Sequence, residues 1–137
     1  MASILWAEDG LDDQYLIKHA LGQLPLAPKV EFVEDGEAVL GALGAGHPDL
    51  VVLDLNMPVL DGVATLRRLK AADGTKAIPV VVFSTGREET AVQTCKRLGV
   101  VDYIQKPFHY NDFTTAVARI CEFAKPGSGA RAKKGKP

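Results

Sequence analysis

The chain has 137 residues, 47% of them hydrophobic, which suits one compact domain and excludes intrinsic disorder of the whole chain. Its 16 Lys and Arg nearly balance 17 Asp and Glu, but residues 126–137 hold four bases and no acid. Residues 1–125 therefore carry 12 bases against 17 acids, a net charge of −5, which argues against DNA as a partner because affinity for a phosphate backbone rests largely on cationic side chains.

The sequence shows no signal for a membrane or for export. No apolar run approaches the roughly 20 residues that a membrane-spanning helix needs. The first seven residues lead directly into Glu8 and Asp9, without the basic start and the cleavage site of a secretory signal. We therefore expect a cytoplasmic protein that does not enter a membrane.

Five apolar segments typical of strands alternate with five helical patterns. The strands are expected at about residues 3–7, 29–33, 49–54, 79–84 and 101–105. The helices are expected at about residues 12–24, 36–45, 61–72, 88–98 and 110–124. This strict alternation predicts a parallel sheet with helices on both faces. We take residues 1–124 as one domain and residues 125–137 as a basic tail rich in Gly and Ala.

The composition of the strands predicts their order in the sheet. Residues 4–7, 50–53 and 80–83 are continuous apolar runs, as expected for strands that are buried on both faces. Residues 29–33 and 101–105 interleave polar side chains and suit the edges. With right-handed crossovers, these assignments favour the strand order 2-1-3-4-5. The predicted fold is therefore an α/β, flavodoxin-like (βα)5 doubly wound sheet.

Several short polar side chains stand where helices are expected to begin. Asp12 or Asp13 can cap the first helix, Asp61 the third and Asn111 the fifth. We interpret Asp12 and Asp13 as capping charges and assign them no other role.

The candidate site groups stand at the ends of the first, third, fourth and fifth predicted strands. In an open parallel sheet the ligand site lies at the carboxyl ends of the strands, so we expect these groups to meet in one shallow pocket. They are Glu8 and Asp9 after the first strand, Asp54 after the third, Ser84 and Thr85 after the fourth, and Lys106 after the fifth. Three neighbouring carboxylates repel one another unless a cation joins them, and oxygen ligands of this kind favour Mg²⁺.

The same groups fit the chemistry of phosphoryl transfer. Asp54 follows a buried central strand, and with a metal bound it can stay ionised and attack a phosphoryl group to give an aspartyl phosphate. Lys106 and the Ser84 hydroxyl would then each contact a phosphoryl oxygen.

From residue 3 to about residue 124 the chain resembles a receiver domain of the two-component response-regulator family. Five matching motifs occur in the order of the strands. They are Glu8-Asp9, Asp54 within Leu53-Asp54-Leu55-Asn56-Met57-Pro58, Asp61-Gly62, Ser84, and Lys106-Pro107-Phe108.

The resemblance implies a phosphoacceptor switch rather than an enzyme. It implies that Asp54 accepts a phosphoryl group from a sensor histidine kinase. It also implies that Asp9, Asp54 and the main-chain carbonyl of Asn56 hold Mg²⁺, while Glu8 acts through a coordinated water. Glu8 is itself a departure, because an Asp is more usual there.

The resemblance further implies how the signal leaves the site. Ser84 and Tyr103 would act as the switch pair, and the Lys106–Pro107 peptide is a candidate for a cis bond. The output would be a protein contact with an unknown downstream partner. A homodimer through the fourth helix, fifth strand and fifth helix is also expected.

More narrowly, the chain is similar to stand-alone receivers that are paired with bacterial phytochrome histidine kinases. The similarity rests on Glu8-Asp9 followed by Asp12-Asp13, and on residues 78–85. It makes a bacteriophytochrome the expected type of kinase.

Two other functions compete with this interpretation. The chain could be a binding module that keeps the receiver fold without phosphorylation. It could also be a Mg²⁺-dependent phosphatase with an aspartyl nucleophile, but such enzymes of the haloacid-dehalogenase type need a second Asp two positions on, where this chain has Asn56. A flavin-binding flavodoxin is disfavoured, because carboxylates replace the phosphate-binding loop after the first strand.

Overall fold

In the computed structural model, which describes residues 1–127, five parallel strands form one sheet. The strands are β1 (Ser3–Ala7), β2 (Lys29–Val33), β3 (Leu50–Leu53), β4 (Val80–Ser84) and β5 (Asp102–Gln105). Their order is β2-β1-β3-β4-β5, which confirms the order and the flavodoxin-like fold predicted from strand composition.

Helices follow each strand. They are α1 (Leu11–Gly22), α2 (Gly36–Ala42), α3 (Gly62–Ala71), α4 (Glu89–Arg97) and α5 (Phe113–Cys121). Two short 3-10 turns, η1 (Leu43–Ala45) and η2 (Tyr110–Asp112), extend α2 and precede α5. Among the described residues, none of these helices is long and apolar enough to cross a membrane.

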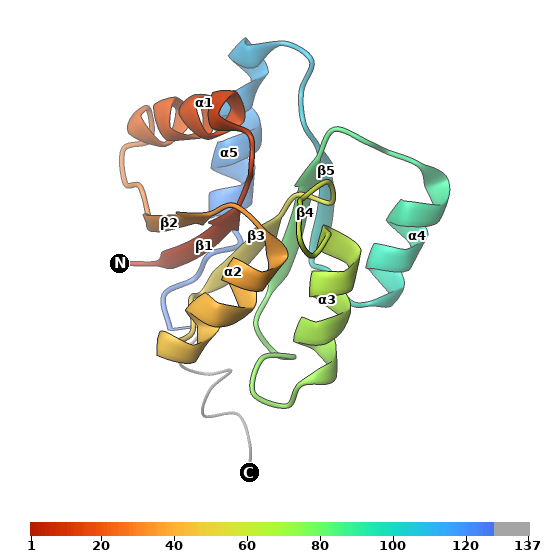
Figure 1. The fold of residues 1–137 in the computed structure, drawn as a ribbon. Coiled ribbons are helices and arrows are strands. Elements are labelled where there is room, and N and C mark those ends of the chain that lie inside the picture. Colours follow the sequence, from red (N-terminus) through yellow and green to blue (C-terminus); the bar gives the residue numbers. More distant parts are fainter. Residues whose placement is uncertain (128–137) are drawn as a thin grey trace.

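The helices divide the core into two layers. Figure 1 shows α1 and α5 on one face of the sheet, with α2, α3 and α4 on the other. Successive residues of β1 supply both layers, as the period of a strand requires: Trp6 packs with α1 and α5, while Leu5 packs with α2 and α3. An edge-on contact between the rings of Phe83 and Phe113, 5.8 Å apart, links β4 to α5.

Burial distinguishes the central strands from the edges. Every residue of β3 and β4 is buried, whereas β2 alternates between exposed and half-buried residues. The apolar runs at residues 50–53 and 80–83 therefore mark central strands, as predicted. Because these strands are rigid and buried, the residues at their carboxyl ends are held in fixed positions.

Two helix caps are made by aspartates. The side chain of Asp61 accepts a hydrogen bond from Ala64 N at 2.9 Å, which confirms its predicted role at the start of α3. Asp35 accepts one from Ala38 N at 2.7 Å and caps α2, a cap that the sequence analysis did not assign.

The other predicted caps are wrong. The first helix begins one residue earlier than expected, after Gly10, which makes no side-chain cap. Asp12 and Asp13 consequently lie in the first turn rather than at the N-cap, where their negative charges still suit the helix N-terminus. Asn111 lies within η2 and makes no capping hydrogen bond, because this extra turn moves the start of α5 beyond it.

Two positions near the end of β3 have special backbone requirements. A side chain at Gly62 would overlap the backbone of Asp54 and Leu55, so the first turn of α3 packs directly on the strand end. Val59, in the loop between β3 and α3, has a φ of 66°, a left-handed conformation that is unfavourable for a β-branched residue. The loop that follows Asp54 is therefore tightly constrained.

The boundary that we predicted at residue 124 lies just beyond α5. Ala124 is still buried against the core, and Lys125 is exposed. Most of the predicted basic tail, residues 128–137, lies outside the described residues.

Candidate functional site

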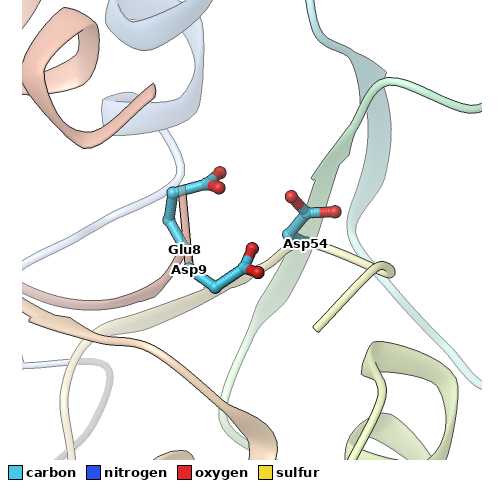
Figure 2. Close-up of side chains that lie close together, drawn as sticks. All are labelled: Glu8, Asp9 and Asp54. Carbon is cyan, nitrogen blue, oxygen red and sulfur yellow. The ribbon is translucent and has the colours of Figure 1, made fainter. Parts of the chain in front are cut away.

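Three carboxylates converge at the carboxyl ends of β1 and β3. Figure 2 shows Glu8, Asp9 and Asp54 directed toward one another. One oxygen from each lies within 4.8 Å of the other two. Glu8 and Asp54 are only 2% and 6% exposed, whereas Asp9 faces solvent. The parallel topology thus brings together the acidic residues that we predicted to meet.

Lys106, at the end of β5, pairs with two carboxylates of this cluster and with Asp13. Its ammonium Nζ lies 2.6 Å from Glu8 Oε1, 2.7 Å from Asp13 Oδ2 and 2.8 Å from Asp54 Oδ2. Lys106 is 5% exposed. Burial by itself lowers the pKa of the Lys106 ammonium, but the hydrogen bonds and charges of the carboxylates outweigh burial and hold that pKa above its ordinary value. Lys106 is therefore a permanent cation in the site.

Glu8 is fixed by its backbone surroundings as well as by Lys106. Its Oε2 accepts a hydrogen bond from Gly10 N at 3.0 Å, and its carbonyl oxygen accepts one from the buried Gln14 amide at 2.6 Å. Burial raises the pKa of the Glu8 carboxyl, and Lys106 and the Gly10 N–H only partly offset that effect. Burial of the Glu8 carboxylate thus carries a clear cost in free energy.

Both carboxylate oxygens of Asp54 are engaged. Oδ1 accepts hydrogen bonds from Ser84 Oγ and from Asn56 N, each at 3.0 Å, while Oδ2 accepts one from Lys106. Ser84 comes from β4 and Lys106 from the end of β5, so three strand ends hold one carboxylate. A carboxylate oriented by three donors is well placed to react along a fixed direction.

Tyr103 connects the neighbourhood of Ser84 to the face formed by β5. Its ring is buried and its hydroxyl donates a hydrogen bond to Gly86 O at 2.6 Å. The Arg87 guanidinium lies 5.8 Å from the centre of the ring. Burial is the main cause that raises the pKa of the Tyr103 hydroxyl. A cavity of about 210 Å³, lined in part by Ser84 and Tyr103, separates this region from α3.

Two expectations about the site are wrong. The Lys106–Pro107 peptide bond is trans, in keeping with the preference of about 0.5–1 kcal/mol for trans before proline. Asp13 is a partner of Lys106 rather than a helix cap. The sequence signal for Asp13 was weak, because its partner lies 93 residues away and the contact depends on the rotation of α1.

Comparison with known proteins supports the family resemblance that the sequence motifs indicate. Residues 4–118 match the family described as "Response regulator receiver domain". The phosphorylated cyanobacterial phytochrome response regulator RcpA is 34% identical, with a TM-score of 0.83 over 90% of this chain and 93% of that one. The Mn²⁺-bound form of response regulator Rcp1 is 30% identical, with a TM-score of 0.82 over 90% and 94% of the two chains.

A curated relative, the probable methanogenesis regulatory protein FilR2 of Methanothrix harundinacea, is 32% identical over 88% of this chain and 81% of its own length. Two further relatives are 35% and 32% identical, but the chain spans only 41% and 49% of their lengths. The chain therefore spans less than half the length of these two relatives. The chain belongs to the response regulator receiver domain family.

Proposed function

We propose that the chain is a response regulator in which Asp54 accepts a phosphoryl group from a phosphohistidine of a sensor histidine kinase. The observation that carries the proposal is the environment of Asp54. This buried carboxylate sits at the end of a central strand and is oriented by Ser84, Asn56 N and Lys106. A buried carboxylate in that position costs free energy. A role in phosphoryl transfer would account for its presence there.

Mg²⁺ is the cofactor that the donor set fits. Glu8, Asp9 and Asp54 supply carboxylate oxygens, the ligands that Mg²⁺ prefers, and one oxygen of each lies within 4.8 Å of the other two. Asp9, Asp54 and the main-chain carbonyl of Asn56 would hold the ion directly, and Glu8 through a water. The ion would offset the negative charge of the cluster and of the incoming phosphoryl group. The Mn²⁺-bound form of Rcp1 supports a divalent ion in this class of site.

The transfer itself requires positioning and charge neutralisation. An oxygen of Asp54 attacks phosphorus as the bond between phosphorus and the donor nitrogen breaks, and the electron pair leaves with the imidazole. Lys106 would donate to one phosphoryl oxygen and the Ser84 hydroxyl to another, because both already contact Asp54. The product is an aspartyl phosphate with two protein donors.

The conformational change on phosphorylation would be transmitted from Ser84 to Tyr103. When Ser84 turns from Asp54 toward a phosphoryl oxygen, the loop between β4 and α4 shifts with it. That loop supplies Gly86 O, the acceptor of the Tyr103 hydroxyl. Phosphorylation can therefore favour one arrangement of the face formed by α4 and β5, provided that the phosphoryl group binds that arrangement more tightly.

The partners follow from this arrangement. The donor histidine has to approach Asp54 over the strand ends, where Leu11 and Phe108 are 72% and 92% exposed beside the site. The similarity to RcpA favours a phytochrome-type kinase as that donor. A homodimer through α4, β5 and α5, or contact of that face with a downstream protein, would carry the output.

Intact-mass spectrometry after incubation with acetyl phosphate tests the proposal, with and without Mg²⁺. We expect one phosphoryl adduct that needs Mg²⁺ and that Asp54→Asn abolishes. If wild-type protein gains no adduct and binds no beryllofluoride, the phosphoacceptor function is excluded. The chain would then be a binding module on a receiver fold. Repeated turnover of phosphate esters would instead favour the phosphatase alternative.

A further inference from the structure

The ammonium group of Lys106 is crowded by carboxylates. Three carboxylate oxygens lie at 2.6 to 2.8 Å from it: those of Asp13 and Asp54 accept hydrogen bonds, and that of Glu8 forms an ion pair. At 5% exposure it has almost no contact with solvent. If Lys106 is to donate to a phosphoryl oxygen, one of these contacts has to be released.

The three contacts differ in how easily they can be released. Glu8 is nearly inaccessible to water, and Gly10 N holds its second oxygen. Asp54 loses its carboxylate charge when it is phosphorylated, so its contact with Lys106 weakens, but its carbonyl oxygen stays beside the phosphoryl group. The side chain of Asp13 is 32% exposed, so water can replace the ammonium as its partner at little cost. Of the two carboxylates that keep their charge, Asp13 is therefore the one whose contact with Lys106 is less costly to lose.

We propose that Asp13 is a positioning residue that holds Lys106 in the unphosphorylated chain and is exchanged for a phosphoryl oxygen on phosphorylation. The proposal deepens the proposed function and rests on it. It also fixes the direction of the effect of Asp13 on phosphorylation. The Asp13 carboxylate competes with the phosphoryl group for Lys106 and therefore opposes phosphorylation. It also links the site to the first turn of α1, which carries Asp13.

The test measures the affinity of the full chain for beryllofluoride, a phosphoryl mimic, at saturating Mg²⁺. Asp13→Asn should bind about three- to tenfold more tightly than wild type, because Lys106 no longer has to leave a carboxylate. Asp12→Asn is the matched control. It removes the same charge one residue away, on an exposed side chain for which the described residues show no ion pair, and should change the affinity less than about twofold. Asp13→Glu should restore the wild-type affinity.

A second measurement follows the exchange in the wild-type chain. The carboxyl carbon of Asp13 should shift in its NMR spectrum when beryllofluoride binds, whereas that of Asp12 should not. This readout does not depend on how well a variant folds.

Two results would overturn the proposal. If Asp13→Asn matches Asp12→Asn, the contact is not exchanged; if Asp13→Asn binds more weakly, Asp13 assists phosphoryl binding rather than opposing it. Failure of the proposed function gives a different pattern, in which wild type binds beryllofluoride no better than Asp54→Asn does.

Discussion

Replacement of Lys106 by Met should destabilise the chain strongly at neutral pH. The substitution keeps most of the buried aliphatic volume but removes the cation from Glu8, Asp13 and Asp54. Loss of one partner from a buried ion pair costs about 3–5 kcal/mol, because the remaining charges are left uncompensated. Asp13 is partly solvated and adds at most about 1 kcal/mol, so most of the loss comes from Glu8 and Asp54.

The stability lost in Lys106→Met should become smaller as the pH falls. Lys106 stays protonated in folded and unfolded chains below its ordinary pKa, so its own titration contributes nothing between about pH 5 and about pH 7.5. Glu8 already has a raised pKa, and without Lys106 that pKa rises further. A carboxyl whose folded pKa exceeds its unfolded pKa binds protons more tightly when folded, so folding gains stability as the pH falls. The variant should therefore recover part of its deficit at the lower pH.

Urea unfolding in the presence of a chelator measures both effects. We expect a deficit of about 3 kcal/mol near pH 7.5 and a clearly smaller one near pH 5. Lys76→Met is the control: its ion pair with Asp73 is exposed, so the change should stay below about 0.5 kcal/mol. A deficit under about 1 kcal/mol, or one that does not change with pH, would refute the account of Lys106 as the cation that holds the cluster.

Three further predictions concern the backbone and the metal. Gly62→Ala should lower the free energy of unfolding by at least about 2 kcal/mol, because the added methyl group overlaps the end of β3. Gly74→Ala, whose methyl group meets open space, should be nearly neutral. Equal effects of the two substitutions in urea unfolding would contradict this prediction. Val59→Gly should raise the unfolding free energy by about 1 kcal/mol, since glycine tolerates a φ of 66°, and a destabilised variant would show that the loop is not strained. Asp9→Asn should weaken Mg²⁺ binding at least about tenfold in calorimetry while Asp12→Asn leaves it nearly unchanged, and unaltered affinity in Asp9→Asn would remove Asp9 from the metal site.

Much of the site follows from topology, which is why the sequence predicted it. Continuous apolar runs mark β3 and β4 as central strands, and in a parallel sheet the residues after central strands meet at one edge. Asp54 and Ser84 are brought together for that reason, and Lys106 joins them from the neighbouring edge strand β5; Ser84 and Lys106 both donate hydrogen bonds to Asp54. Their roles in phosphorylation remain predictions.

The parts that the sequence did not reveal depend on small energy differences or on the exact placement of helices. Asp13 lies in the first turn of α1 and pairs with Lys106, a contact that becomes visible only once α1 is placed against the end of β5. The peptide before Pro107 is trans, and the sequence could not decide this because the two isomers differ by only about 1 kcal/mol. The close packing of Gly62 on β3 is visible only once the strand end and α3 are placed.

The most direct test of the central claim is to locate the phosphoryl group. Protein phosphorylated in Mg²⁺ can be treated with borohydride, which reduces an acyl phosphate, and the modified residue can be found by peptide mass spectrometry. Our account predicts that the modification falls on Asp54 and that Asp54→Asn shows none. Modification of another residue, or a phosphoryl group on a histidine such as His109 that resists the reduction, would contradict it.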